Sequence, residues 1–205
     1  MSRRTLFSLF LAFGLSALAT VTYAEALPGA AAPAFTLTDV NGKRVQLADF
    51  RGKYVVLEWN NPSCPFVQKH YNSGNMQALQ KRFTDASVAW LTINSTAMSH
   101  PEFRQPADLA AWMKQRGGIP TALMLDPDGK VGHAYDARAT PHMYVIDPKG
   151  TLIYAGAIDD KRSTNTADVK TAKNYVVAAL DDALAGRQVG IGHTQAYGCT
   201  IKYSD

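Results

Sequence analysis

The sequence has little of several features that would define a function at once. It contains only two cysteines among 205 residues, Cys64 and Cys199, so at most one intrachain disulfide can form. It has no cluster of Lys and Arg and no interleaved aromatic stripe, which argues against nucleic acid as a partner. His100, His133 and His193 have no companion at a metal-ligand spacing. We therefore expect neither a cofactor nor a resident metal ion.

The N-terminal residues are typical of a Sec-type signal peptide. Arg3 and Arg4 precede an apolar run over residues 6–15, which is too short to span a membrane comfortably, and small residues follow it up to Ala24. Cleavage is expected after Ala24 or after Ala19. The alternative is an uncleaved membrane anchor, and only in that case do we expect contact with a membrane. The segment predicts a periplasmic or secreted protein.

The rest of the chain is long enough for one domain with a sizeable core. Removal of residues 1–24 leaves about 180 residues and lowers the formal net charge from +4 to +2. We divide this part into a linker (25–32), a globular domain (33–186) and a C-terminal tail (187–205) that carries Cys199. An exported chain with two cysteines can hold a disulfide, and an oxidising compartment favours one.

One stretch has the features of a reactive-cysteine site. Residues 54–57 form an apolar, β-branched run that predicts a buried strand, and the chain from Cys64 onward can turn helical. Ser63 can serve as the N-cap, and Pro65 is tolerated in the first turn because its missing N–H would be unpaired there. A sulfur at Cys64 would lie beside the unpaired N–H groups of the helix, which favour the thiolate. The alternative is an inert, buried cysteine.

The order of elements predicts an α/β fold. Apolar and polar residues alternate on both sides of Asn41-Gly42, which indicates a hairpin over residues 35–47. Strands and helices then alternate, which indicates a sheet covered by helices on both faces. These later elements are expected as a helix to about residue 83 that is divided at 72–75, a strand at 88–94, a helix at 106–116, a strand at 120–125, a helical turn at 131–135, a hairpin at 141–156 and a helix at 167–185.

Short motifs lie at matching places along this pattern: Ala32-Pro33-Ala34-Phe35-Thr36-Leu37, the Gly42 turn, Gly52-Lys53, the Cys64 corner and Thr140-Pro141. With them, residues 33–185 resemble the thioredoxin superfamily, and within it the redoxin (AhpC/TSA, peroxiredoxin-like) group. The resemblance implies a thioredoxin-like α/β fold with a central mixed sheet and an N-terminal hairpin. It also implies that Thr140-Pro141 is a cis-proline segment beside the active sulfur, where the backbone before the proline pairs with a bound peptide or thiol. Pro120 is the rival position.

Two departures from the family pattern limit what the resemblance implies. A dithiol thioredoxin has a Cys-x-x-Cys motif, but Val67 occupies its second cysteine position, so no local partner can resolve a mixed disulfide. A peroxiredoxin has Thr or Ser three residues before its peroxidatic cysteine, and Asn61 stands there. The sequence therefore resembles a branch with a single cysteine, Cys64, at the first thioredoxin position.

We expect a thiol-disulfide redox protein whose site residues are Cys64, Cys199, Thr140 and Pro141. Cys64 would attack a disulfide or an oxidised sulfur, and the mixed disulfide would need a second thiol for its resolution, for which Cys199 is the only candidate. A bond between them requires Cα atoms within roughly 7 Å. A catalytic pair, a structural clasp and an unpaired state all remain open. The expected partners are protein thiols or disulfides and an external thiol reductant.

Two other functions compete with this hypothesis. In a thiol peroxidase, a small peroxide would oxidise Cys64 to a sulfenic acid, and Cys199 would condense with it. In a copper-binding module related to the Sco group, the available soft ligands would be Cys64, His70, His142 and Cys199. His142 follows Pro141 and should lie near Cys64, whereas His70 should point elsewhere.

Several polar residues near the corner are expected to have no special role. Lys69 and Tyr71 are expected to face solvent, and Asp159-Asp160 is expected to be a solvated acidic pair. Trp59 and Phe66 are expected to flank the corner as core residues.

Overall fold

This computed structural model describes residues 26–204, so the expected signal peptide lies outside the described residues. Within that range, no helix has both the length and the apolar character needed to cross a membrane. The elements in chain order are β1 (Thr36–Asp39), β2 (Arg44–Gln46), the 3₁₀ helix η1 (Leu47–Phe50), β3 (Val55–Trp59), α1 (Pro65–Asn72), α2 (Asn75–Asp85), β4 (Ala89–Asn94), α3 (Pro106–Gln115), β5 (Ala122–Leu125), α4 (Lys130–Ala134), β6 (Ala139–Thr140), β7 (His142–Ile146), β8 (Leu152–Gly156), the 3₁₀ helix η2 (Thr166–Lys170), α5 (Tyr175–Leu184) and β9 (Cys199–Thr200).

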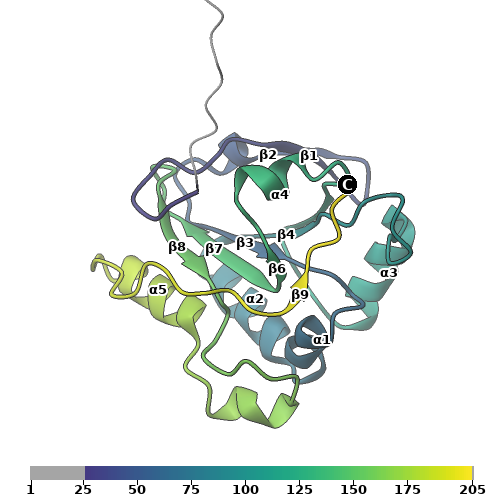
Figure 1. Cartoon of the computed structure of the whole chain (residues 1–205). Helices are drawn as coiled ribbons and strands as arrows, with labels where there is room; N and C mark the ends of the chain where they lie inside the picture. Colours follow the sequence, from purple (N-terminus) through teal and green to yellow (C-terminus); the bar gives the residue numbers. More distant parts are fainter. Residues whose placement is uncertain (1–25, 205) are drawn as a thin grey trace, which may run out of the picture.

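Seven strands form one mixed sheet in the order β2-β1-β5-β4-β3-β7-β8 (Figure 1). The central strand β3 runs parallel to β4 and antiparallel to β7. The expected N-terminal hairpin is present, because Leu37 of β1 pairs with Val45 of β2, and β1 joins the sheet through β5. Every residue of β3 and β4 is buried, as expected for central strands with both faces covered.

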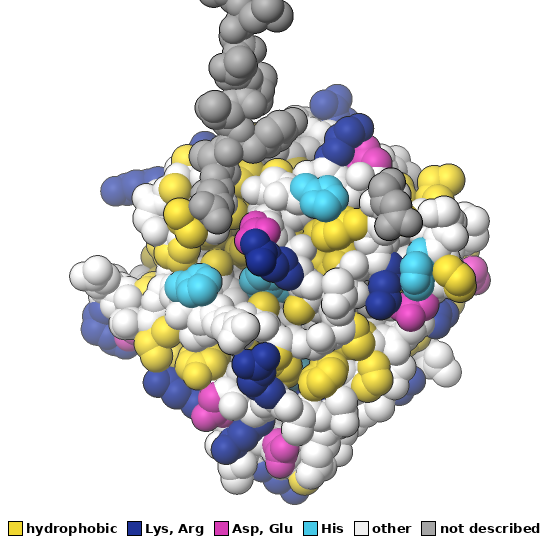
Figure 2. All heavy atoms as spheres, viewed as in Figure 1, with side chains coloured by type: hydrophobic (Ala, Val, Ile, Leu, Met, Phe, Trp, Pro, Cys, Tyr) yellow, Lys and Arg dark blue, Asp and Glu magenta, His cyan; other side chains and the backbone are white. Residues whose placement is uncertain are grey.

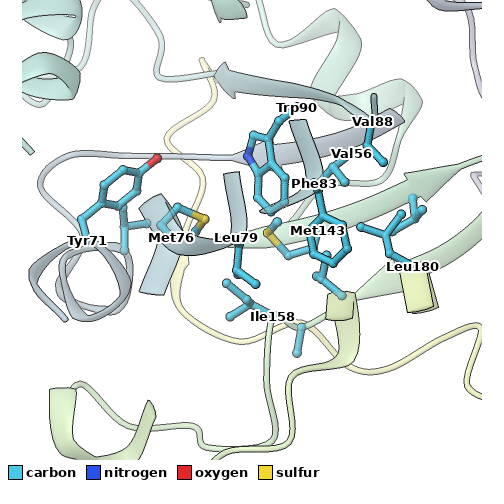
Figure 3. Close-up of a cluster of buried hydrophobic side chains, with 14 of the residues drawn as sticks. Val56, Tyr71, Met76, Leu79, Phe83, Val88, Trp90, Met143, Ile158 and Leu180 are labelled. Carbon is cyan, nitrogen blue, oxygen red and sulfur yellow. The ribbon is translucent and has the colours of Figure 1, made fainter. Parts of the chain in front are cut away.

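Two hydrophobic cores lie on opposite faces of this sheet. Side chains alternate along a strand, so Val56 of β3 joins one core while Val55 and Leu57 join the other. The first core packs α1, α2, α3 and α5 against the sheet, with Trp90, Met143 and Leu180 among its members (Figure 3). The second core lies under α4, η1 and the end of the tail. Helices therefore cover both faces, as the sequence predicts.

Two helical segments are divided. The expected break at residues 72–75 is present, because α1 ends at Asn72 and Gly74 has a φ of +77° before α2 begins. The expected continuous helix over 167–185 is wrong, since η2 and α5 are separate. The reason is local: the Asn174 side chain accepts a hydrogen bond from Val177 N at 2.9 Å and starts α5 as a new helix.

The C-terminal tail returns across the domain instead of leaving it. In Figure 1 the yellow tail passes from α5 across β9 toward α4. The Thr194 side chain hydrogen-bonds Tyr154 OH at 2.6 Å, and Tyr203 OH donates to Ala137 O at 2.7 Å. Between these two contacts, β9 pairs antiparallel with β6. The tail is thus held on both sides of Cys199.

Candidate active site

Cys64 lies at the junction between the buried end of β3 and the start of α1. Asn61 shapes the loop before it, because Asn61 O accepts a hydrogen bond from Cys64 N at 3.0 Å and its side chain accepts one from Ser63 N at 2.9 Å. Cys64 is itself the N-cap residue, and its carbonyl oxygen accepts from Gln68 N at 2.9 Å. The expectation that Ser63 caps the helix is therefore wrong by one residue, since the Asn61 side chain holds Ser63 N in the preceding turn.

The Thr140-Pro141 segment lies directly against Cys64. Its peptide bond is cis, whereas the bond before the rival Pro120 is not. The Cys64 thiol donates to Thr140 O, with 3.1 Å between sulfur and oxygen. Cys64 is only 1% exposed, so the sulfur is covered on the side of the tail as well as on the side of the core.

Strand β9 brings Cys199 to the same place. Cys199 pairs with Thr140 across the β6–β9 ladder, and Thr140 Oγ1 donates to Cys199 O at 3.5 Å. Gly198 packs so closely that an added Cβ would overlap Thr140 O. Burial, and then the neighbouring Cys64 thiol, raise the pKa of Cys199 to about 12. Both cysteines are free thiols, and Cys199 is the more exposed of the two.

A buried carboxylate lies in the core beneath the corner. Glu58 of β3 is fully buried, and such a group is tolerated only when its oxygens are hydrogen-bonded. Its five side-chain donors are Asn60, Tyr71, Gln80, Trp90 and Thr92. The expectation that Tyr71 faces solvent is wrong, because its hydroxyl donates to Glu58 at 2.8 Å. Burial and the nearby Glu58 hold the pKa of Tyr71 well above its usual value.

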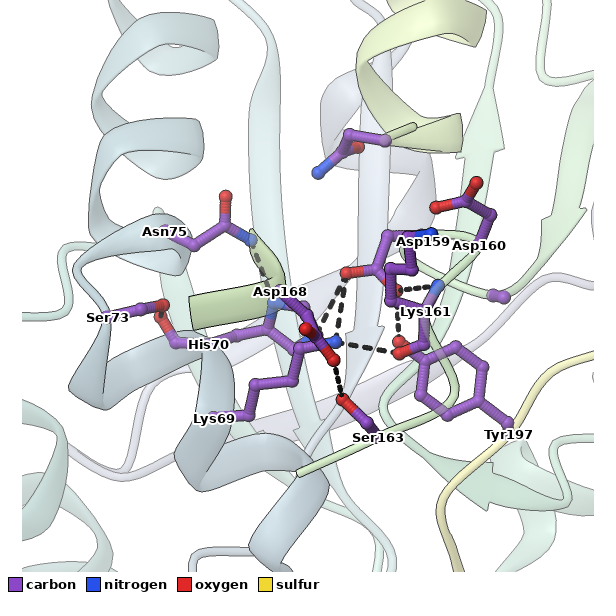
Figure 4. Close-up of polar contacts among 12 residues, drawn as sticks. Lys69, His70, Ser73, Asn75, Asp159, Asp160, Lys161, Ser163, Asp168 and Tyr197 are labelled. Carbon is purple, nitrogen blue, oxygen red and sulfur yellow. Dashed lines mark hydrogen bonds and ion pairs between the residues drawn. The ribbon is translucent and has the colours of Figure 1, made fainter. Parts of the chain in front are cut away.

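A second buried polar cluster joins helix α1 to the tail (Figure 4). Lys69 Nζ lies 3.2 Å from Asp159 Oδ2 and donates to Lys161 O at 2.7 Å. The Tyr197 hydroxyl donates to the other oxygen of Asp159. The predictions that Lys69 and Asp159 face solvent are wrong, since each is at most 2% exposed. Their opposite charges meet across the interface between α1 and the loop after β8, which compensates in part for burial.

Neither histidine proposed as a copper ligand is free of other partners. His70 Nδ1 lies 2.8 Å from Asn75 Nδ2, and His142 Nδ1 lies 3.1 Å from Tyr144 OH. Burial lowers the pKa of each histidine to about 4. Among residues 26–204, no three His, Cys, Asp or Glu side chains are placed together so that they could hold a metal ion. The histidines visible in Figure 2 are spread among hydrophobic and basic side chains.

The sequence pattern of the AhpC/TSA family matches residues 28–155, which is more than half of the chain. The chain belongs to the AhpC/TSA family. This AhpC/TSA chain is accordingly a redoxin of the thioredoxin superfamily, as the sequence motifs suggest, and its mixed sheet has the thioredoxin-like arrangement.

Relatives of this AhpC/TSA chain carry two kinds of name. The thiol-disulfide oxidoreductase ResA of Bacillus subtilis strain 168 is 30% identical over 125 residues, which cover 61% of this chain and 64% of ResA. The match thus spans slightly less than two thirds of that relative. A protein of Mycobacterium tuberculosis strain H37Rv, named as a candidate peroxiredoxin, is 29% identical over 159 residues, which cover 75% of this chain and 91% of the relative.

A solved structure also resembles the AhpC/TSA chain along most of its length. The crystal structure of an uncharacterized conserved protein from Geobacillus kaustophilus superposes with a TM-score of 0.74 at 27% identity. The superposition covers 94% of this chain and 98% of that one. The fold predicted from the sequence is therefore confirmed.

Proposed function

We propose that this protein is a thiol-disulfide oxidoreductase that alternates between two free thiols and a Cys64–Cys199 disulfide. The observation that carries the proposal is the position of Thr140, which pairs with Cys199 in β6–β9 and accepts a hydrogen bond from Cys64 at 3.1 Å. One residue thus contacts the sulfur of Cys64 and the backbone of Cys199. The name of the relative ResA supports the same class of reaction.

In the proposed reaction, Cys64 is the nucleophile. Its thiolate attacks one sulfur of a substrate disulfide, forms a mixed disulfide and releases the first substrate thiolate. Cys199, once deprotonated, attacks the Cys64 sulfur, closes the intramolecular disulfide and releases the second substrate thiol. The substrate gains two electrons and two protons, and the protein loses them. An external thiol reductant then returns the protein to its dithiol form.

The different surroundings of the two sulfurs support this assignment of roles. Cys64 lies at the start of α1, where unpaired N–H groups stabilise negative charge on a nearby sulfur. The raised pKa of Cys199 keeps that thiol protonated near neutral pH, so it is a poor first nucleophile. Thr140 and Pro141 would act as positioning residues, because Thr140 contacts both cysteines through its backbone.

The proposal is tested by equilibrating the protein with mixtures of reduced and oxidised glutathione and then blocking free thiols with a maleimide. We expect the wild type to lose both free thiols together, and Cys199→Ser to stop at a glutathione adduct on Cys64. Cys64→Ser should form no rapid adduct, because burial, the main cause of the raised pKa of Cys199, still disfavours its thiolate. If both cysteines of the folded wild type still react with the maleimide after equilibration under oxidising conditions, the proposed function is wrong.

A peroxidase is the second candidate, and the burial of Cys64 favours it. At 1% exposure, the sulfur is more easily reached by a small peroxide than by a protein disulfide unless the tail lifts. Cys64 would displace water from hydrogen peroxide to become a sulfenic acid, and Cys199 would condense with it and release a second water. A stopped-flow rate with hydrogen peroxide no faster than that of free cysteine excludes this function.

We also propose that residues 1–24 direct export and that the cycle runs in the periplasm or outside the cell. A compartment that supports disulfides suits a two-thiol cycle with protein thiols or disulfides as partners. On this proposal the mature protein consists of the domain 33–186, preceded by residues 25–32 and followed by the tail 187–205. Mass analysis of the protein recovered from the periplasmic fraction tests the cleavage site and the compartment together.

A further inference from the structure

We propose that Lys69, Asp159 and Tyr197, here called the tail anchor, position Cys199 so that it can resolve a mixed disulfide on Cys64. The inference rests on the proposed function and extends it to three residues other than the two cysteines, Thr140 and Pro141. It concerns a buried charged cluster for which the proposed reaction has no other use.

The tail anchor connects the two cysteines through helix α1. Lys69 lies on the second turn of α1, the helix whose N-cap is Cys64, and its side chain is fully buried against Asp159. Asp159 Oδ1 accepts a hydrogen bond from the Tyr197 hydroxyl, and Tyr197 lies two residues before Cys199. The helix that carries the first sulfur therefore also holds the segment that carries the second.

Ring contacts strengthen the same connection. Phe66, in the first turn of α1, meets Tyr197 edge to face with ring centroids 5.8 Å apart. Lys69 Nζ lies 5.8 Å from the centroid of the Tyr197 ring, within the range of a cation–π contact. Tyr197 is 4% exposed, so its hydroxyl has no bulk water to replace Asp159 as a partner. Loss of the anchor should therefore free the tail in this region.

The step that needs this positioning is the closing of the intramolecular disulfide. In the mixed disulfide, the group bonded to the Cys64 sulfur occupies space beside the tail. The tail is therefore less firmly docked in the mixed disulfide than in the dithiol protein. The rate of closure then depends on the fraction of molecules in which Cys199 is held beside Cys64. Each contact of the tail anchor raises that fraction.

The test compares Tyr197→Phe with Thr194→Val. The first keeps the aromatic ring and removes the hydroxyl bonded to Asp159. The second removes the hydroxyl that contacts Tyr154 OH at 2.6 Å and Ala157 N at 2.9 Å, upstream of the anchor in the same tail. Each variant loses one hydrogen-bonded hydroxyl, buried at Tyr197 and partly buried at Thr194. The melting temperature of each variant is recorded, so that the two rates are compared at a known loss of stability.

Two rates distinguish positioning from general loosening. The first is closure of the disulfide after a rapid pulse of oxidised glutathione, and we expect Tyr197→Phe to slow it on the order of tenfold. The second is alkylation of Cys64 by iodoacetamide in a Cys199→Ser background, and we expect the same change at Tyr197 to accelerate it by a similar factor. Thr194→Val should alter each rate by less than about twofold.

The outcomes separate the inference from the function on which it rests. If the wild type forms no Cys64–Cys199 disulfide, both proposals fall. If the wild type closes the disulfide but the two variants change both rates equally, the proposed function stands and the role of the tail anchor is wrong. If Tyr197→Phe leaves both rates unchanged, the role of the anchor is again wrong.

Discussion

The two cysteines occupy regions that are built in different ways. Cys64 lies after a short loop that follows a strand whose five residues are all buried between two cores, and Cys64 itself is a member of the first core. Cys199 lies in a two-residue strand that pairs only with β6 among the described elements, and a few side chains hold the surrounding tail. The comparison teaches that changes at the corner should act on the stability of the fold. Changes in the tail should act on the meeting of the two sulfurs.

The largest expected effect is on stability and comes from Lys69, which lies on the corner helix α1 and also belongs to the tail anchor. Lys69→Met leaves Asp159 buried without its cation, and removal of one partner of a buried pair costs about 3–5 kcal/mol. Lys81→Met breaks an exposed pair with Asp85 on α2 and should cost no more than about 0.5 kcal/mol. Urea unfolding of both variants measures the difference. Equal losses would mean that the Lys69 pair contributes no more than a surface pair.

A pH dependence of comparable size should come from His70 and His142. Burial lowers the pKa of each to about 4 from its ordinary 6.5, so both stay neutral in the folded protein where the unfolded chain binds protons. The unfolded state therefore binds more protons between pH 4 and 6.5, and stability should fall as the pH drops through that window. Each group contributes up to about 3 kcal/mol.

The measurement is the urea midpoint at several pH values between 4 and 7.5. His142→Gln should flatten the pH dependence by removing one of the two groups, even if it also lowers stability at pH 7.5. An unchanged slope in that variant would show that His142 takes up its proton as easily in the folded protein as in the unfolded chain.

On the tail side, Gly198→Ala should prevent Cys199 from docking. Gly198 has a φ of +135°, and an added Cβ would overlap Thr140 O, so the substitution carries strain of about 1–3 kcal/mol that lifting of the tail would relieve. Disulfide formation against glutathione should become at least about tenfold less favourable. Gly190→Ala is the matched change, because its Cβ would meet the nearest atom at an ordinary 3.7 Å. If Gly198→Ala and Gly190→Ala change disulfide formation equally, the close packing of Gly198 against Thr140 does not control the docking of Cys199.

The smallest effect is expected from Asn174→Ala, which lies outside both regions. The substitution removes the N-cap of α5 and should cost about 1 kcal/mol. Because no hydrogen bond joins α5 to Cys64 or Cys199 among the described residues, the rate of Cys64 alkylation and the glutathione equilibrium should stay unchanged. A shift in either would show that the corner and the tail are coupled through the whole core and are not held locally.

The sequence predicted those parts of the site that depend on local pattern. The β-branched run before Cys64, the proline after it and the Thr140-Pro141 segment are all short-range signals, and the structure places these segments together. The sequence also predicted the hairpin at Asn41-Gly42, because a two-residue turn fixes the pairing of its own flanks.

The contacts missed at the sequence level are those between distant residues. Lys69 and Asp159 are 90 positions apart, and nothing near either one indicates that the two charges meet in the interior. The docking of Cys199 beside Thr140 depends on the tail contact at Tyr197, whose partner Asp159 lies far away in the chain. Glu58 did carry a usable signal, since an acidic residue inside an apolar strand must find several donors. The expected helix over 167–185 is too long at its start, because the Asn174 cap begins α5 only at Tyr175.

The placement of Cys199 on a tail strand outside the seven-stranded sheet has a consequence for the life of the protein. A protease that cut the backbone between Tyr197 and Cys199 would separate the second thiol from the domain without cutting any strand of that sheet. On the proposed function, the nicked protein would lose the covalent link to its internal partner sulfur and would depend on an outside thiol for turnover. A single cut in the tail would thus change the chemistry of this protein.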